Sequence, residues 1–537
     1  MCSKSADELC TELFRYTSGR WLWYEEQQLR DRFSPFNVSQ LQRVAAAGLG
    51  VRECVGIAKL AEGSFNKTFK LTMDDGSSAI ARIPHPVAGP RHYTTASEVA
   101  TMDFARNVLD IPAPQVFAWS ADAENPVGSE YIIMEHAPGT KLDDVWNDLS
   151  LEEKVAIVKN LVSLQKKMLS LSFNRYGNLY YASDNIQGAV PAEVTGDVPT
   201  DVKETILRRF AIGPVADRAF WSKERAEIED IDRGPWKRPQ DYAASVAQRE
   251  MKWISRFAIP KQSDDPLLPS VTQNIPSSHI SLLQRYLDVA PYFFPGDDHS
   301  DVVASYLSHT DLHSGNIFVE NGRISSLIDW QETWAAPLLL LARHPRLVDY
   351  DGEIILKPPA NFKELDPTEK KRIRETMSKS IILYLYEQQL AEEVPLLDKA
   401  IRFEYGRTRC EPVLFAGNTW DNDIIPLRES LIRVEKYWDD LGINIPCPIH
   451  FTDEDLRLHD KEGEGWNDVQ DFWKSIEFIV MKDGWTSNES YDDACKLFGE
   501  LRETGSSIWL VKREKTLKGR QSDSIFNHKW RYPSRGV

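Results

Sequence analysis

The sequence predicts an α+β protein in which a small antiparallel β-rich lobe precedes a larger, mainly helical lobe. Short apolar and β-branched runs separated by turn signals cluster between residues 55 and 134. Helical patterns dominate the chain after residue 140. Near the midpoint, residues 309–330 combine a polar loop with an apolar hairpin. These three observations predict two lobes, with the polar loop of residues 309–330 in the helical lobe.

The predicted division of the chain follows these changes of texture. We expect an N-terminal helical extension over residues 1–50, a β-rich lobe over 51–136 and a helical lobe over 137–537. The interval between residue 136 and His309 is longer than two simple lobes require. We therefore predict a mainly helical insertion at about 175–300, and a basic tail from Lys512 to the end.

The β-rich lobe is predicted to hold five strands and one amphipathic helix. The strands are expected at 55–60, 67–73, 78–83, 116–119 and 130–134, and the helix at 96–109. Helices are expected before this lobe at 6–16, 24–33 and 40–47, the last capped near Asn37. Later helices are expected in 140–171, with a capping box of Ser150 and Glu153, and at 199–210, 242–257, 281–290, 368–397, 421–441 and 468–480.

Composition narrows the class of protein. The 537 residues are 42% hydrophobic and 27% charged, as in a soluble globular protein. A net charge of −17 disfavours nucleic acid and anionic membranes as partners and weakly favours a small cationic substrate. No run of about twenty apolar residues is present, so no transmembrane segment is predicted.

Cysteine usage and the N-terminus bear on the compartment. The six cysteines are scattered without a CxxC pair, which is typical of reduced thiols in a cytosolic or mitochondrial protein. Lys4 is accompanied by Asp7 and Glu8, unlike the acid-poor, Arg-rich pattern of a transit peptide.

The most informative motif is His309-Thr-Asp-Leu-His-Ser-Gly-Asn316, followed by Ile328-Asp329-Trp330. Phosphoryl transfer from ATP needs a carboxylate to accept a hydroxyl proton, and an amide oxygen and a second carboxylate to hold Mg²⁺. Asp311 fits the first role, and Asn316 and Asp329 fit the second. A hairpin of strands 317–319 and 326–328 would return Asp329 beside Asn316. The alternative is an ordinary polar loop beside a hairpin.

These residues resemble the aminoglycoside phosphotransferase family, which is related to choline kinase. Three further segments resemble a mostly fungal branch labelled altered inheritance of mitochondria protein 9: Arg15-Tyr-Thr-Ser-Gly-Arg-Trp21, Tyr93-Thr-Thr-Ala-Ser-Glu-Val99 and Tyr131-Ile-Ile-Met-Glu135. The resemblance covers residues 10–440 and implies a protein-kinase-like two-lobed fold, with ATP and Mg²⁺ as cofactors. The family label suggests mitochondria, whereas the N-terminus does not, so mitochondrial and cytoplasmic locations both stay open.

The resemblance also places the nucleotide. Gly63, Ser64 and Phe65 would form the turn over the phosphates. Arg82 stands where kinases carry a strand lysine, and Glu98 would be its helix partner. The plain alternatives are a hairpin turn and a buried ion pair without a nucleotide role.

The adenine is expected at the end of the last strand of the small lobe. Backbone groups of Glu135 and Ala137 would contact the adenine edge, and Met134 would lie behind the base. Lys59, Lys67 and Lys70 are predicted to face solvent. His309 is expected to brace the catalytic loop rather than transfer protons.

The predicted function is a kinase that phosphorylates a hydroxyl group of an unidentified small molecule. A nucleotide-binding pseudokinase or scaffold is the alternative, favoured by Arg82 and the glycine-poor loop. A kinase of protein side chains ranks last, since no A-P-E-like signature follows Asp329. No nucleic acid partner is expected, and the sequence identifies no protein partner.

Overall fold

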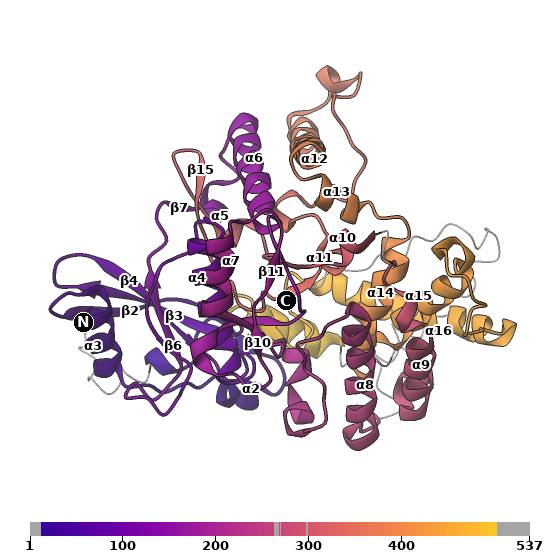
Figure 1. Ribbon diagram of the computed structural model, residues 1–537. Helices are drawn as coiled ribbons and strands as arrows, with labels where there is room; N and C mark the ends of the chain where they lie inside the picture. The colour runs from indigo at the N-terminus through magenta and orange to yellow at the C-terminus, as the bar shows by residue number, and fades with distance from the viewer. Residues whose placement is uncertain (1–11, 262–267, 269, 297–298, 502–537) are drawn as a thin grey trace. The chain divides into compact units, whose positions relative to one another are not determined.

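The computed structural model describes residues 12–261, 268, 270–296 and 299–501 (Figure 1). The chain forms two compact units. Among the described residues, 17–30 group with 471–501, and 12–16 group with those of 31–470. The predicted helix at 6–16 lies partly, and the basic tail wholly, outside the described residues.

A five-stranded antiparallel sheet forms the small lobe of the first unit, as predicted. Its strand order is β2-β3-β4-β6-β5. The helix α4 (Tyr93–Asn107) connects β4 to β5, and α3 (Val38–Leu49) precedes β2 (Figure 1). The strands are β2 (Cys54–Glu62), β3 (Asn66–Met73), β4 (Ser78–Pro84), β5 (Val116–Ser120) and β6 (Tyr131–Glu135).

Alternation along the strands gives the sheet two different faces. Phe69 and Leu71 of β3 are buried in one apolar cluster with Leu41 of α3. The opposite face of the sheet carries Arg82. This residue pairs in register with Ile132, so both side chains point to that face. The predicted cap is present, because Asn37 Oδ1 accepts a hydrogen bond from the Gln40 backbone N–H at 3.1 Å.

The prediction that Lys67 faces solvent is wrong. Its place in the alternation of β3 is on the core face, where its side chain is fully buried. Lys67 Nζ donates to the Arg32 carbonyl at 2.7 Å and lies 3.3 Å from His85 Nδ1. Burial lowers the pKa of Lys67 to about 8 and the pKa of His85 to about 3. The small lobe thus contains a buried basic cluster behind its sheet.

The large lobe is mainly helical, and the predicted hairpin is present. The strands β14 (Ile317–Glu320) and β15 (Arg323–Leu327) pair antiparallel, and β7 (Thr140–Lys141) extends them. The helix α6 (Leu151–Met168) begins with the predicted capping box. The other helices up to the second unit are α5 (Leu142–Val145), α10 (Ser300–Val303), α11 (Leu338–Leu341), α12 (Pro367–Glu393), α13 (Pro395–Ile401), α14 (Gly406–Ala416), α15 (Ile424–Lys436) and α16 (Asp453–Ile476).

Several helix boundaries differ from their predictions, and the predicted helix at 368–397 is divided into α12 and α13. A short π-helical turn at 419–423 precedes α15, where one continuous helix from 421 was predicted. The helix α16 begins fifteen residues before the predicted start at 468.

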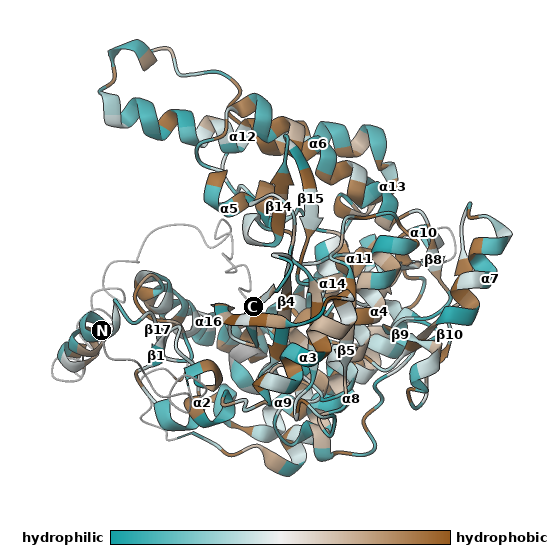
Figure 2. Ribbon diagram, turned by 90° about the vertical axis from the view of Figure 1, so that its left-hand side faces the viewer, coloured by the Kyte–Doolittle hydropathy of each residue, from teal (hydrophilic) through white to brown (hydrophobic). Residues whose placement is uncertain are grey.

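In α12 all buried residues lie in the second half, and its first half is largely hydrophilic (Figure 2). No helix in the described ranges combines the length and apolarity needed to cross a bilayer.

The insertion has the three predicted helices but also strands that were not predicted. The helices are α7 (Thr200–Arg209), α8 (Pro239–Phe257) and α9 (Pro276–Val289), the last two packed side by side (Figure 1). Short strands in the first part of the insertion belong to two small sheets. One sheet consists of β9 (Asn178–Tyr181), β10 (Val190–Pro191) and β12 (Phe210–Gly213). In the other, β11 (Val194–Thr195) joins three strands from outside the insertion: β8 (Ser172–Phe173), β13 (Ser305–Leu307) and β16 (Ala335–Pro337). Segments this short show too few alternations to be recognised from sequence.

The second unit joins two distant parts of the chain. The strand β1 (Arg20–Trp21) pairs antiparallel with β17 (Trp485–Thr486), and α2 (Glu25–Asp31) follows β1. The guanidinium of Arg20 lies 3.6 Å from the ring centre of Tyr491. A cation over an aromatic face stabilises such a small unit.

The buried His85 makes the stability of the small lobe pH-dependent. Its pKa falls from the ordinary 6.5 to about 3 on folding, so the unfolded chain binds more protons between these values. The stability that depends on neutral His85 is therefore fully present above about pH 6.5, and it is lost as the pH falls from 6.5 towards 3. We expect His85→Gln to flatten this dependence by up to about 1.4 kcal/mol per pH unit. Denaturant unfolding of both proteins from pH 4.5 to 7.5 measures the difference, and parallel curves would contradict the assignment.

Candidate active site

Backbone hydrogen bonds bring the two ends of the catalytic hairpin together. The Ile328 N–H donates to the Asn316 carbonyl at 3.0 Å, which places Asp329 next to Asn316 as predicted. Gly315 lies in the turn at Ser314–Asn316. A Cβ at this position would lie 2.6 Å from His313 Cε1, so the turn favours glycine. The loop is thus built around a position that excludes a larger residue.

Asp311 is held in a polar setting that keeps it ionised. Asn316 Nδ2 donates to the Asp311 carbonyl at 3.1 Å and to its Oδ2 at 3.2 Å. His313 Nε2 lies 3.6 Å from Oδ2, and Arg346 Nη1 lies 3.3 Å from Oδ1. Hydrogen bonding to His313, with the positive charge of Arg346, lowers the pKa of Asp311. The carboxylate is half-exposed and so is accessible to a substrate.

Asn316 and Asp329 offer suitable donors for Mg²⁺. Both amide hydrogen bonds of Asn316 go through Nδ2, which leaves its Oδ1 available. The Asp329 side chain is 44% exposed, and its backbone has a positive φ of 65°. Carboxylate and amide oxygens are the hard ligands that Mg²⁺ prefers, with phosphates and water completing its shell. The donor chemistry therefore fits the ion.

His309 is placed as the sequence predicted, as a brace. Its Nε2 lies 2.9 Å from the Ile328 carbonyl, and its Nδ1 accepts from the Asp311 N–H at 3.3 Å. Burial lowers the pKa of His309, so the ring is neutral and spans the two sides of the loop. The Trp330 ring packs edge-on against it, with ring centres 4.8 Å apart.

Arg82 contacts Glu98, as predicted, and also reaches the catalytic hairpin. Its Nη1 donates to Glu98, while its Nη2 lies 2.9 Å from Asp329 Oδ1 and 2.6 Å from Gln331 Oε1. The guanidinium and the Glu98 carboxylate are buried. Burial raises the pKa of Glu98 to about 7 against the attraction of Arg82. One guanidinium thus joins β4, α4 and the segment that follows the hairpin.

The turn over the predicted phosphate site is structured differently from the prediction. The Gly63 N–H donates to the Asn66 carbonyl at 3.0 Å and is therefore not directed to a ligand. In the described part of the chain, no hydrogen bond engages the amides of Ser64 and Phe65. A Cβ at Gly63 would meet nothing within 4 Å, so this glycine is not required by close packing. The two following amides are better placed to bind phosphate oxygens.

The predicted adenine site lies at the end of β6. Met134 faces the same side of the sheet as Arg82, because Ile80 pairs in register with it. The Glu135 N–H donates to the Gln115 carbonyl at 2.8 Å, and its side chain accepts from Arg106 at 3.0 Å. The Glu135 N–H and side chain are thus engaged within the protein.

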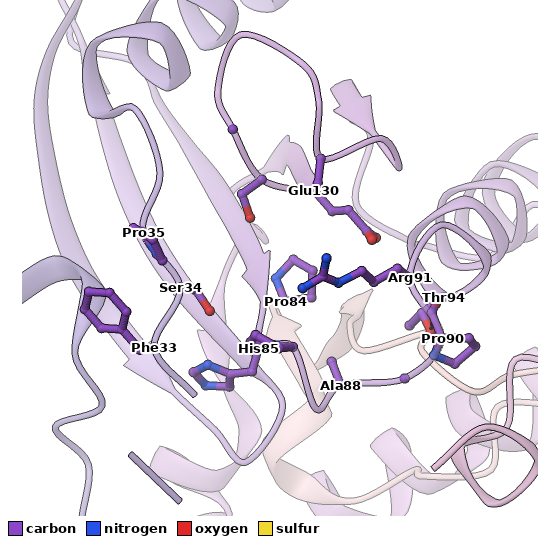
Figure 3. A pocket seen from close by; sticks show the side chains of 15 residues that line it. Phe33, Ser34, Pro35, Pro84, His85, Ala88, Pro90, Arg91, Thr94 and Glu130 are labelled. Atoms are coloured by element: carbon purple, nitrogen blue, oxygen red, sulfur yellow. Dashed lines mark hydrogen bonds between the residues drawn. The ribbon is translucent and has the colours of Figure 1, made fainter. Parts of the chain in front are cut away.

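A cavity of about 200 Å³ lies beside the β4–α4 connection, away from the catalytic motif at 309–330 (Figure 3). Its walls come from residues 33–35, the connection at 84–91 and the turn at 128–130. Glu130 accepts from the His92 N–H at 3.0 Å and from Thr95 Oγ1 at 2.6 Å, which ties this wall to the start of α4. None of the lining residues belongs to 309–330, so we do not assign the cavity to the nucleotide.

Sequence reasoning missed Gln331, Arg218 and Arg346. Gln331 Oε1 accepts hydrogen bonds from Arg82 and, at 2.7 Å, from Asn66 Nδ2. Its Nε2 donates to the Ala88 carbonyl at 2.9 Å. Its position two residues after Asp329 was an available signal. Arg218 lies in the insertion, with its guanidinium 3.5 Å from the Phe65 ring centre and its Nε 2.8 Å from Glu332. No local pattern marks Arg218 or Arg346.

The fold is that of a kinase-like phosphotransferase, and similarity to known proteins gives the same class. Residues 56–339 match the family described as "Phosphotransferase enzyme family". A subtelomeric hrmA-associated cluster protein of Aspergillus fumigatus is 32% identical over 84% of this chain and 92% of its own. Altered inheritance of mitochondria protein 9 of Yarrowia lipolytica is 25% identical over 93% of this chain and 89% of its own. The chain therefore belongs to the phosphotransferase enzyme family.

Solved structures of the same class are similar at low identity. A thermostable mutant of aminoglycoside phosphotransferase APH(4)-Ia is 15% identical, covering 75% of this chain and 100% of its own, with a TM-score of 0.34. A putative aminoglycoside phosphotransferase from Ralstonia eutropha is 15% identical, covering 81% of this chain and 99% of its own, with a TM-score of 0.37.

The buried pair of Arg82 and Glu98 has a measurable consequence for stability. Arg82→Met leaves Glu98 buried without its partner, which costs about 3 kcal/mol or more of unfolding free energy. We expect the double variant Arg82→Met/Glu98→Leu to recover more than half of that loss, because no buried charge is stranded. Urea unfolding of the wild type, both single variants and the double variant measures the coupling. Additive losses would show that the two side chains do not depend on each other.

Proposed function

We propose that the protein transfers the γ-phosphoryl group of ATP, with Mg²⁺, to a hydroxyl group of a small molecule. The observation that carries this proposal is the assembly of Asp311, Asn316 and Asp329 on one braced hairpin. Membership of the phosphotransferase family supports the same reaction class.

Asp311 would receive the proton of the acceptor hydroxyl. The hydroxyl oxygen attacks the γ-phosphorus and forms a new O–P bond. The bond from that phosphorus to the oxygen bridging the β-phosphate breaks, and ADP leaves with the electron pair. The low pKa of Asp311 suits a reaction in which little base strength is needed, since the transition state is largely dissociative.

Asn316 Oδ1 and Asp329 would hold Mg²⁺, which neutralises charge on the phosphates when bound. Arg82 currently bonds Asp329, so binding requires this guanidinium to turn its free face towards the phosphates. Glu98 would retain Arg82 during the change, through the bond to its other nitrogen.

A second candidate function is nucleotide binding without transfer. It is supported by the same contact, since the Arg82–Asp329 pair occupies a carboxylate that the metal needs. The Gly63 N–H is also engaged within its own turn. In this reading the protein would serve as a pseudokinase or scaffold.

The catalytic assignment makes separate predictions for binding and transfer. Asp311→Ala should abolish phosphate transfer, at least a hundredfold, and leave the affinity for ATP within about threefold, because Asp311 meets the acceptor. Asp329→Ala should abolish transfer and also remove the Mg²⁺ dependence of ATP binding. Transfer is measured with γ-labelled ATP and a metabolite extract, and binding by calorimetry with AMP-PNP.

Asp144→Ala is a matched control, because this carboxylate lies in α5, outside the hairpin. The variant should leave both phosphate transfer and AMP-PNP binding unchanged. Wild-type binding of AMP-PNP without any labelled product, over extracts of several kinds, would favour the pseudokinase. Full transfer by both catalytic variants would refute the assignment.

We further propose a mitochondrial location, because the similar protein of Yarrowia lipolytica is named altered inheritance of mitochondria protein 9, mitochondrial. The chain tagged at its C-terminus and expressed in a fungal cell is expected to co-purify with mitochondria and to resist added protease until the membranes are opened. Recovery of the tagged protein in the cytosolic fraction would refute this location.

A further inference from the structure

A short segment after the hairpin lies against the catalytic loop and supplies arginines to it. Arg343 Nη2 donates to the Thr310 carbonyl at 3.0 Å, and the Leu347 N–H donates to the Leu312 carbonyl at 3.1 Å. These two bonds bracket Asp311 and fix residues 343–347 beside it. The side chains of this segment therefore border the place where an acceptor hydroxyl must approach.

Arg346 contacts the one oxygen of Asp311 that the loop itself does not use. Its Nη1 lies 3.3 Å from Oδ1, whereas Asn316 and His313 face Oδ2. The Arg346 and Asp311 side chains are 39% and 42% exposed. An ion pair so open to water contributes little by itself and is readily exchanged for another anion.

Residues 343–347 bring positive charge to one side of Asp311. Both Arg343 and Arg346 belong to this segment, and His313 Nε2 lies on the other side, 3.6 Å from Asp311 Oδ2. The acids that follow this segment, Asp349, Asp351 and Glu353, are all exposed. Asp143 is nearby but is hydrogen-bonded to Ser314 Oγ at 2.6 Å.

We propose that the acceptor carries an anionic group, a carboxylate or a phosphate ester, close to the hydroxyl that is phosphorylated. Arg346 leaves Asp311 Oδ1 for this anion, and the vacated oxygen receives the hydroxyl. Arg346 makes and breaks no covalent bond; it positions the acceptor. This inference rests on the proposed transfer reaction and gives it a substrate class.

The overall charge of −17 does not oppose this inference. Charges in water are screened beyond roughly 8–10 Å at physiological salt, so distant acids steer a ligand only weakly. At contact, the guanidinium groups decide which charge is accepted. A polycationic acceptor would meet Arg343 and Arg346 at the position where it must place its hydroxyl.

Four alcohols on one three-carbon skeleton test the charge preference: glycerol, glycerate, glycerol 3-phosphate and 3-amino-1,2-propanediol. Each is titrated calorimetrically into the full chain saturated with AMP-PNP and Mg²⁺, which keeps anions away from the nucleotide phosphate site. We expect glycerate or glycerol 3-phosphate to bind at least tenfold more tightly than glycerol and the amine. Arg346→Ala should remove this preference, and Arg346→Lys should retain part of it.

Arg208→Ala is the control, since this exposed arginine lies on α7. The inference is overturned if the amine binds as tightly as the anions, if no anion is preferred, or if the preference survives Arg346→Ala. It is also overturned if Arg346→Ala weakens AMP-PNP instead, which would make Arg346 a nucleotide ligand. Failure of the wild type to bind AMP-PNP at all would count against the proposed function, which separates the two failures.

Discussion

The arrangement of the candidate site depends on one buried cation, the guanidinium of Arg82. It bonds Glu98 on α4, Asp329 after the hairpin and the neighbouring Gln331. A buried charge is tolerated only when it is paired and hydrogen-bonded, so these three segments must be in place together. The position of α4 relative to the sheet and the position of the Asp329 carboxylate are therefore set by the same group.

Arginine serves this role better than lysine would. Its planar fork reaches carboxylates on two sides, whereas an ammonium group acts as a point charge. Gln331 extends the connection, because it also bonds Asn66 at the end of the phosphate turn and the Ala88 carbonyl before α4. The small lobe and the hairpin are thus linked by hydrogen bonds that a bound nucleotide would have to rearrange.

The parts of the structure that were predictable are those specified by nearby residues. The hairpin at 317–327 follows from two apolar runs around an Asn-Gly turn, and the capping box at Ser150 from residues three apart. Lys67 was misassigned although the alternation of β3 places it on the core face, because the groups that accommodate its charge there, at Arg32 and His85, are distant in sequence. Arg346 was missed for the same reason, since only the folded chain brings it to Asp311.

The two functional carboxylates share one feature that no motif describes: each is paired with an arginine. Asp329 is bonded by Arg82 and Asp311 by Arg346, at 2.9 and 3.3 Å. Each arginine thus holds a positive charge against one oxygen of its acid. Phosphates can take over Arg82, and an anionic acceptor can take over Arg346. Each acid would then be released for its role only when the matching substrate is bound.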